Sequence, residues 1–164
     1  MNNQIIGHIA GSSGSGKTYI GELIQQKFPS IIVKDLDDFN DEIQHSEKFK
    51  NMDDNLKIEY YKNKFKKLLN IFIIENPQKI LFVGYNSNWN SWINIETNNK
   101  LFIKILTENI IKQKYDRDSQ FKFISENDIM NWKKSINNDI IEYKQNNYKF
   151  MSSKKIYDFL LKII

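Results

Sequence analysis

The sequence is poor in several residue types, and each shortage excludes a class of protein. It has no cysteine, two prolines and one arginine in 164 residues. Without cysteine the chain forms neither a disulfide nor a thiolate metal site, and His8 and His45 are too far apart in sequence to favour a histidine-based zinc site. No apolar run approaches the roughly 18 residues of a membrane-spanning helix, and the first residues lack the pattern of a secretory signal. We therefore expect a soluble cytoplasmic protein.

The positive charge of the chain comes almost entirely from lysine. The formal net charge is +4, and Lys, Asn and Ile are abundant while Arg and Pro are scarce, a bias typical of AT-rich genomes. That bias explains much of the basicity, so nucleic-acid binding is not favoured. A mildly positive field still favours anionic small molecules.

Apolar strands and amphipathic helices alternate along the whole chain. Expected strands cover residues 4–10, 31–33, 80–83, 101–106 and 148–150. Expected helices cover residues 18–28, 42–50, 54–75, 107–118 and 125–146, with a last helix capped by Ser152 or Ser153. Residues 85–99 are expected to form a polar loop. This alternation predicts an α/β fold, a parallel sheet covered on both faces, in one domain spanning residues 1–164.

The segment GSSGSGKT lies between the first strand and the first helix. It matches the phosphate-loop pattern, in which glycines let the backbone amides approach phosphate oxygens at a helix N-terminus. Lys17 is predicted to bridge the β- and γ-phosphates, and the Thr18 hydroxyl to ligate Mg²⁺. The predicted ATP-binding residues are Gly11, Ser12, Ser13, Gly14, Ser15, Gly16, Lys17, Thr18 and Tyr19.

With this motif in place, the sequence resembles a small P-loop kinase of the nucleoside and nucleotide kinase type. The resemblance covers essentially the whole chain and is strongest at the phosphate loop. It implies a three-layer α/β/α fold with a five-stranded parallel sheet in the order 2-3-1-4-5. It also implies transfer of the γ-phosphate of ATP, with Mg²⁺ as cofactor.

The acidic segment from Asp35 to Phe39 follows the second strand. In similar kinases an acid here orients or deprotonates the acceptor hydroxyl, or holds Mg²⁺ through water. Asp37 and Asp38 are both candidates for the base, and Asp37 is also a candidate for the metal site. The third strand ends at Gly84 without the aspartate that many P-loop proteins carry there, so Asp35, Asp37 or Asp38 would take its place.

The only arginine, Arg117, lies in the helix after the fourth strand. In similar kinases this helix leads into a lid that brings cations over the transferred phosphoryl group, and a planar, permanently charged guanidinium suits that task. The resemblance therefore assigns Arg117 a catalytic role, with Lys112 and Lys114 as weaker candidates.

Aromatic residues follow the third strand on the expected acceptor side. Tyr85, Trp89 and Trp92 could stack on a base or form a hydrophobic cover over the loop. The turn of residues 150–153 corresponds to the one beside adenine in related kinases. His8 is expected to be a packed histidine of the sheet, without a role in chemistry.

These features together predict an ATP-dependent small-molecule kinase acting on a nucleoside or nucleotide. Two alternatives remain: a shikimate-kinase-like enzyme acting on another metabolite, and a non-catalytic or regulatory nucleotide-binding protein. A GTPase is not favoured, because the Asn-Lys-x-Asp guanine motif is absent from the sequence.

Overall fold

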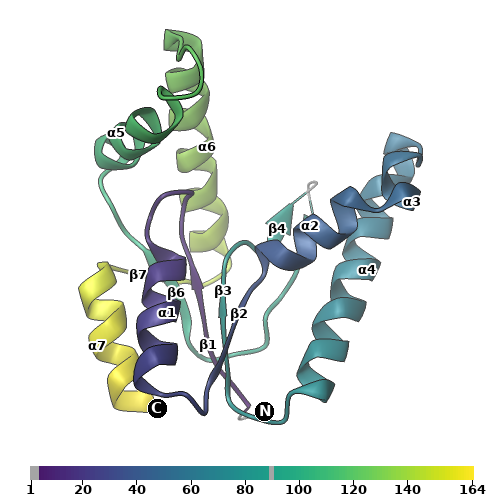
Figure 1. The fold of residues 1–164 in the computed structure, drawn as a ribbon, viewed down its shortest axis with the longest axis vertical. Helices are drawn as coiled ribbons and strands as arrows, with labels where there is room; N and C mark the ends of the chain where they lie inside the picture. Colours follow the sequence, from purple (N-terminus) through teal and green to yellow (C-terminus); the bar gives the residue numbers. More distant parts are fainter. Residues whose placement is uncertain (1–3, 89–90) are drawn as a thin grey trace.

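Five parallel strands form the central sheet of the computed structural model, which describes residues 4–88 and 91–164 (Figure 1). Their order is β2-β3-β1-β6-β7. The strands are β1 (Ile5–Ala10), β2 (Ile32–Asp35), β3 (Ile80–Val83), β6 (Lys100–Ile103) and β7 (Lys149–Met151). Counted without the separate hairpin β4–β5, this is the order 2-3-1-4-5 that the resemblance implies, so the fold class is confirmed.

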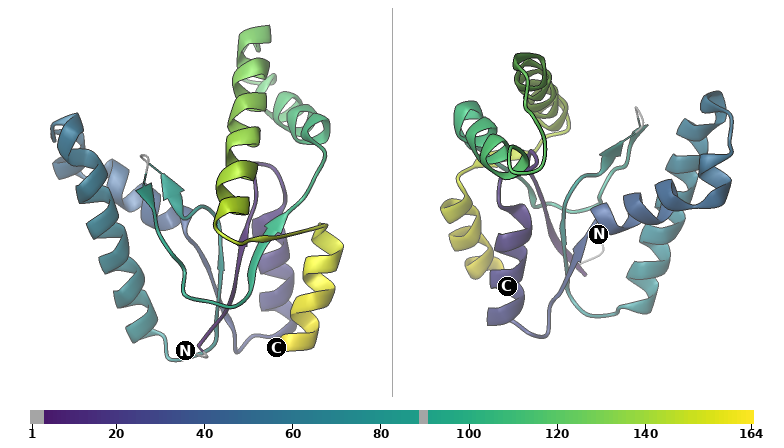
Figure 2. Two further views of the ribbon diagram at one scale, coloured as in Figure 1. Left: turned by 180° about the vertical axis from the view of Figure 1, so that it is seen from behind. Right: turned by 45° about the horizontal axis from the view of Figure 1, so that its top comes forward.

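Helices cover both faces of the sheet and complete the three layers (Figure 2). The helices are α1 (Lys17–Lys27), α2 (Asp37–His45), α3 (Glu47–Lys50), α4 (Asp54–Glu75), α5 (Thr107–Asp118), α6 (Glu126–Gln145) and α7 (Ser153–Ile163). Because side chains alternate along a strand, β3 contributes side chains to the cores on both faces of the sheet. Its Leu81 and Val83 pack with α1 and α7, whereas Ile80 and Phe82 pack in the core cluster of α2, α3 and α4.

Two helical arms rise beyond the carboxyl ends of the strands, where the phosphate loop lies (Figure 1). One arm is the hairpin of α5 and α6, and α6 contributes Tyr143 to an aromatic cluster with Phe102 of β6. The other arm is formed by α2, α3 and the upper part of α4, which pack on one another. Tyr85, which follows β3, contacts residues of both arms, Asp37 of α2 and Asp139 of α6.

Most of the predicted elements are confirmed, and α4 has the bounds expected from the sequence. The capping box that opens α6 is present, with Ser125 accepting from the Asp128 amide. Ser152 caps α7. Thr107 is the first residue of α5 and does not cap it, because Leu106 occupies the N-cap position.

Two predictions for the segments after β2 and β3 were wrong. The helix expected at 42–50 begins at Asp37, because acidic residues suit the positive end of a helix. It ends at His45, because the next residue, Ser46, has an extended backbone; the Ser46 side chain caps the short α3. The polar loop of residues 85–99 contains a small hairpin, formed by β4 (Ser87–Asn88) and β5 (Ser91–Trp92).

Among the helices in the described part of the chain, none has the length and apolar character needed to cross a bilayer.

Candidate active site

The loop between β1 and α1 has the backbone conformation that its glycines make possible. Gly14 and Gly16 have φ values of 86° and 85°, a left-handed region that other residues adopt only with strain. Gly11 is needed for a different reason, because a Cβ atom there would lie 2.4 Å from the Ser15 hydroxyl oxygen. The motif therefore folds as a tight loop before α1, in which the Ser15 amide donates to the Ser12 carbonyl.

This loop presents hydrogen-bond donors and a positive charge at the start of α1. Gly16 is the N-cap residue and has no side chain to accept from the first-turn amides, which lack partners within the helix. Lys17 is buried, and its ammonium lies 5.3 Å from the centre of the Tyr85 ring. The buried hydroxyl of Ser15 has no partner in the described part of the structure. These groups suit an anion such as the phosphate chain of a nucleotide.

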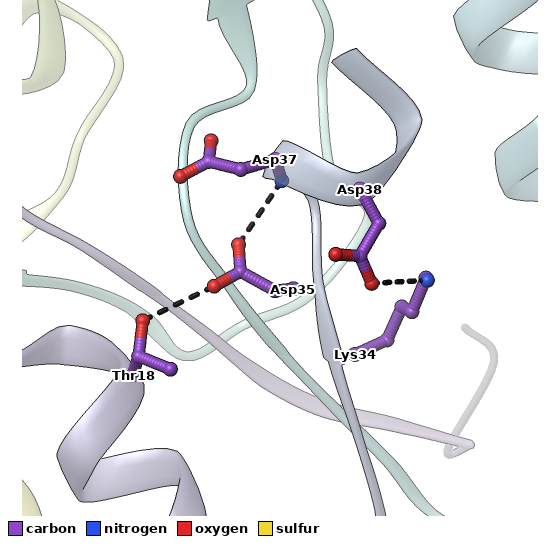
Figure 3. Close-up of polar contacts among 5 residues, drawn as sticks. All are labelled: Thr18, Lys34, Asp35, Asp37 and Asp38. Carbon is purple, nitrogen blue, oxygen red and sulfur yellow. Dashed lines mark hydrogen bonds and ion pairs between the residues drawn. The ribbon is translucent and has the colours of Figure 1, made fainter. Parts of the chain in front are cut away.

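Asp35, the last residue of β2, connects α1 to α2 (Figure 3). Its Oδ2 accepts from the Thr18 hydroxyl at 3.1 Å, and its Oδ1 accepts from the Asp37 amide at 3.0 Å. Gly84 lies against this carboxylate, and a Cβ atom there would come within 2.3 Å of Oδ1. The glycine at the end of β3 thus makes room for a carboxylate supplied by the neighbouring strand.

The pair Thr18 and Asp35 fits a magnesium site of the kind used with nucleotides. No group of three or more carboxylate or histidine side chains that could hold a metal occurs among residues 4–88 and 91–164. Mg²⁺ at a nucleotide does not need one, because it keeps waters and binds one or two protein oxygens plus phosphates. Sequence reasoning placed Asp37 beside Thr18, and that metal assignment stays a prediction; the observed contact favours Asp35.

Asp37 lies in the first turn of α2, within range of the Lys17 charge. Its Oδ1 accepts from the Asn40 side chain and from the Tyr85 amide, each at 3.2 Å. Burial raises the pKa of the Asp37 carboxyl; the charge of Lys17 opposes this rise, and that of Asp35 adds to it. A carboxyl group with a raised pKa beside a lysine is suited to accept a proton.

Asp38, the other candidate base, lies in a different environment. Its carboxylate pairs with Lys34 at 2.5 Å and its side chain is 60% exposed. Figure 3 shows this pair separated from Thr18 and Asp35. The structure therefore distinguishes two carboxylates that the sequence left equivalent, although the role of each stays a prediction.

Asp139 of α6 reaches the same loop and was missed by sequence reasoning. Its Oδ2 accepts from the Ser12 hydroxyl at 3.2 Å and from the Tyr85 hydroxyl at 2.6 Å. Helical spacing could have identified it. Asp139 lies three residues after Ile136 and four before Tyr143, both of which are buried, so the three residues share one face of α6.

Two of the candidate cations of α5, Lys114 and Arg117, lie in different surroundings. Lys114 is partly buried, lies over the Trp132 ring at 5.1 Å and lines a hollow of about 50 Å³ with Ser12 and Ser13. Burial lowers the pKa of Lys114. Arg117, in the last turn of α5, is exposed and pairs with Asp118 at 2.6 Å. Its catalytic role stays a prediction, and Lys114 is the α5 cation nearer the loop.

The remaining aromatic and histidine predictions have mixed outcomes. Trp92 packs edge-on against Tyr143 and Tyr148, which agrees with the hydrophobic alternative. Trp89 lies outside the described residues. His8 is buried in the sheet between the Tyr148 hydroxyl and the Gly84 carbonyl, and burial lowers its pKa to about 4, so it is the packed histidine expected. Tyr19 is exposed.

A larger cavity, of about 670 Å³, lies elsewhere on the molecule. It is lined by residues at the amino ends of β1 and β6 and by residues 94–99. Since the strands are parallel, this cavity lies at the edge of the sheet opposite the phosphate loop, and it does not belong to the site described here.

Comparisons with known proteins bear on the fold. No protein-family model matches the sequence, and no curated protein is significantly similar to it. A crystal structure of shikimate kinase from Bacteroides thetaiotaomicron has a TM-score of 0.55 at 16% identity, covering 96% of this chain and 94% of that one. An uncharacterised protein from Eubacterium ventriosum has a TM-score of 0.56 at 14% identity, covering 97% of both chains.

The sheet order, the phosphate-loop motif after β1 and these neighbours show a three-layer α/β fold of the kind found in P-loop proteins. The fold of the chain is similar to that of the shikimate kinase structure, which agrees with the fold that the resemblance implied.

Proposed function

We propose that this protein is an ATP-dependent phosphotransferase that transfers the γ-phosphate of ATP to a hydroxyl group of a small acceptor. A nucleoside or nucleotide is the acceptor favoured by the sequence. One observation carries the proposal: Asp35 at the carboxyl end of β2 and Asp37 at the start of α2 occupy different positions. Asp35 contacts Thr18 of the phosphate loop, and Asp37 is partly buried where the charge of Lys17 reaches it.

These positions suit two different tasks in phosphoryl transfer. Lys17 and the amides of residues 11–19 would bind the phosphates of ATP. Thr18 and Asp35 would hold Mg²⁺, which neutralises phosphate charge and orients the γ-phosphate. Asp35 would also keep the Thr18 hydroxyl turned toward the metal through the hydrogen bond that the two share.

Asp37 would accept the proton of the acceptor hydroxyl. The acceptor oxygen forms a bond to the γ-phosphorus, the bond from that phosphorus to the bridging oxygen of ADP breaks, and the hydroxyl proton moves to Asp37. Its raised pKa brings the carboxylate closer to the working pH, where a general base is most effective. Asn40 and the Tyr85 amide hold the carboxylate in place for this step.

The burial of Asp37 also favours an enzyme over a non-catalytic nucleotide-binding protein. Desolvation of an ionised carboxylate is unfavourable, and a protein that only binds a nucleotide has no evident use for a second acid there. The missing aspartate after β3 does not count against turnover, because Asp35 lies against Gly84 and contacts Thr18.

A turnover assay with purified protein tests the proposal. ADP release would be measured with Mg-ATP and a panel of nucleosides, nucleoside monophosphates and hydroxy acids. We expect acceptor-dependent ADP release in the wild type and a loss of about 10²- to 10⁴-fold in kcat for Asp37→Asn. The matched control is Asp41→Asn, an exposed carboxylate on the same helix, which should retain activity.

The pH dependence gives a second readout for Asp37. Because its pKa is raised, kcat/KM should fall as the pH drops through a value above the ordinary aspartate range near 3.9. Asp37→Asn should remove this acidic limb.

ATP binding without ADP release for every acceptor in the panel would instead support the non-catalytic alternative.

A further inference from the structure

Tyr85 joins two carboxylates that come from the two arms of the molecule. Its amide donates to Asp37 of α2, and its hydroxyl donates to Asp139 of α6. Asp139 also accepts from Ser12 of the phosphate loop. The charge of Lys17 acts on both carboxyl groups. A molecule that receives a phosphoryl group beside Lys17 and Asp37 therefore also lies near Asp139.

The α6 side of this region carries a second acid. Glu142 lies one turn after Asp139, and its Oε1 accepts from the Ser87 hydroxyl of the hairpin at 2.7 Å. Burial raises the pKa of the Asp139 carboxyl, and the neighbouring charge of Glu142 adds to that effect. The α6 wall of the site is thus built from carboxylates, hydroxyl groups and Tyr85.

The cations near these carboxylates are lysines that also lie at the phosphate loop. Lys17 belongs to that loop, and Lys114 lines a hollow with Ser12 and Ser13 that Tyr85 and Asp139 also line. On the α2 side, Lys34 pairs with Asp38. The only arginine of the chain, Arg117, is exposed and pairs with Asp118. Guanidinium groups are the usual bidentate partners of carboxylate and phosphate, and none faces Asp37.

We propose that Asp139 is a specificity-determining residue that contacts the acceptor, and that the acceptor is a hydroxyl compound without negative charge. Amino alcohols, amino sugars and nucleosides are of this class, whereas hydroxy acids and nucleoside monophosphates are not. The inference rests on the proposed function and narrows it. An anionic acceptor would face two carboxylates, whereas an ammonium or hydroxyl donor gains a charge-assisted hydrogen bond.

Competition between matched acceptors tests the inference. The probes are glucosamine against glucuronate, and adenosine against adenosine monophosphate, each at fixed Mg-ATP with phosphorylated product measured directly. In the wild type, kcat/KM should be at least about tenfold higher for the member without negative charge, as expected for one close unit charge in a partly solvated site. Equal or higher kcat/KM for the anionic members would overturn the inference.

Variants of Asp139 give the second readout. Asp139→Asn keeps a hydrogen-bond acceptor and should lower the ratio of glucosamine to glucuronate kcat/KM by on the order of tenfold, and Asp139→Lys should lower it further. The ratio is insensitive to changes in ATP affinity caused by the contact with Ser12. Asp158→Asn, an exposed carboxylate on α7, is the control and should leave the ratio unchanged.

An unchanged ratio in folded Asp139→Asn, checked by thermal denaturation and ATP binding, would overturn the role of Asp139. Failure of the proposed function has a different signature: no acceptor of either charge would receive phosphate, although ATP binds. In that case the inference fails together with the function on which it rests.

Discussion

The site has two sides, or flanks: one formed by β1, α1 and β2, the other by α5 and α6. They differ in the sequence separation of the residues that contact each other. On the β1–β2 flank, Thr18 and Asp35 are 17 residues apart, and the loop before them is shaped by its own glycines. On the α5–α6 flank, Asp139 contacts Ser12 across 127 residues. The first flank is therefore specified by local sequence, and the second depends on where a long helix is placed by the packing of the core.

The largest effect is expected on the first flank, from Lys17→Ala. This change removes the buried ammonium of the loop, and we expect kcat/KM for phosphoryl transfer to fall by about 10³-fold or more, since one preorganised charge is commonly worth that much. Steady-state kinetics measure the loss. Lys27→Ala, at the exposed end of the same helix, is the control and should behave as the wild type.

The fold should survive Lys17→Ala, because the core clusters do not depend on this side chain. Circular dichroism and thermal denaturation check this. Normal turnover in the folded variant would show that phosphoryl transfer does not take place at the phosphate loop. Neither flank would then belong to the reacting site.

A smaller effect is expected for Asp35→Asn. Asparagine can still accept from Thr18 or the Asp37 amide but lacks the charge that favours a divalent cation. The Mg²⁺ concentration for half-maximal activity should rise by roughly 10- to 100-fold, the range typical of groups that orient metal ligands. A magnesium titration of ADP release measures it.

Asp37→Asn is the comparison for this titration. If Asp35 serves the metal and Asp37 the acceptor, Asp37→Asn should lower kcat at every Mg²⁺ concentration without shifting the midpoint. A shifted midpoint in Asp37→Asn, with none in Asp35→Asn, would restore the metal assignment made from the sequence.

The same contrast explains what the sequence could predict. The phosphate loop, the helix at 54–75 and the parallel sheet follow from a local motif, hydrophobic periodicity and the strand–helix alternation, and the strand order was implied by the resemblance to P-loop kinases. The candidates that the sequence left equivalent, Asp37 and Asp38, differ by the rotation of the first turn of α2, which depends on Asp35 binding the Asp37 amide. Composition and spacing do not contain that contact.

The residues of the α5–α6 flank were harder to predict from the sequence, because tertiary packing determines their positions. Asp139 lies on the buried face of α6, but helical phase alone does not say which neighbour it meets. On α5 the rarity of arginine drew attention to Arg117. At 1.5 Å per residue, Arg117 lies about 4.5 Å farther along the helix than Lys114, and its observed partner is Asp118. The catalytic role of Arg117 stays a prediction.

The smallest predicted effect decides which α5 cation acts in catalysis. Lys114 lines the hollow beside Ser12 and Ser13, so Lys114→Ala should lower kcat by about tenfold while the Kd of ATP changes less, since the cation acts on charge that develops during transfer. Arg117→Ala should have the smaller effect of the two. Lys144→Ala, exposed in the last turn of α6, is the control. Lys114→Arg should restore part of the activity if charge is what matters. A larger loss at Arg117 than at Lys114 would mean that the α5–α6 hairpin moves during turnover and carries the guanidinium to the phosphates, and the sequence-based assignment would then be the correct one.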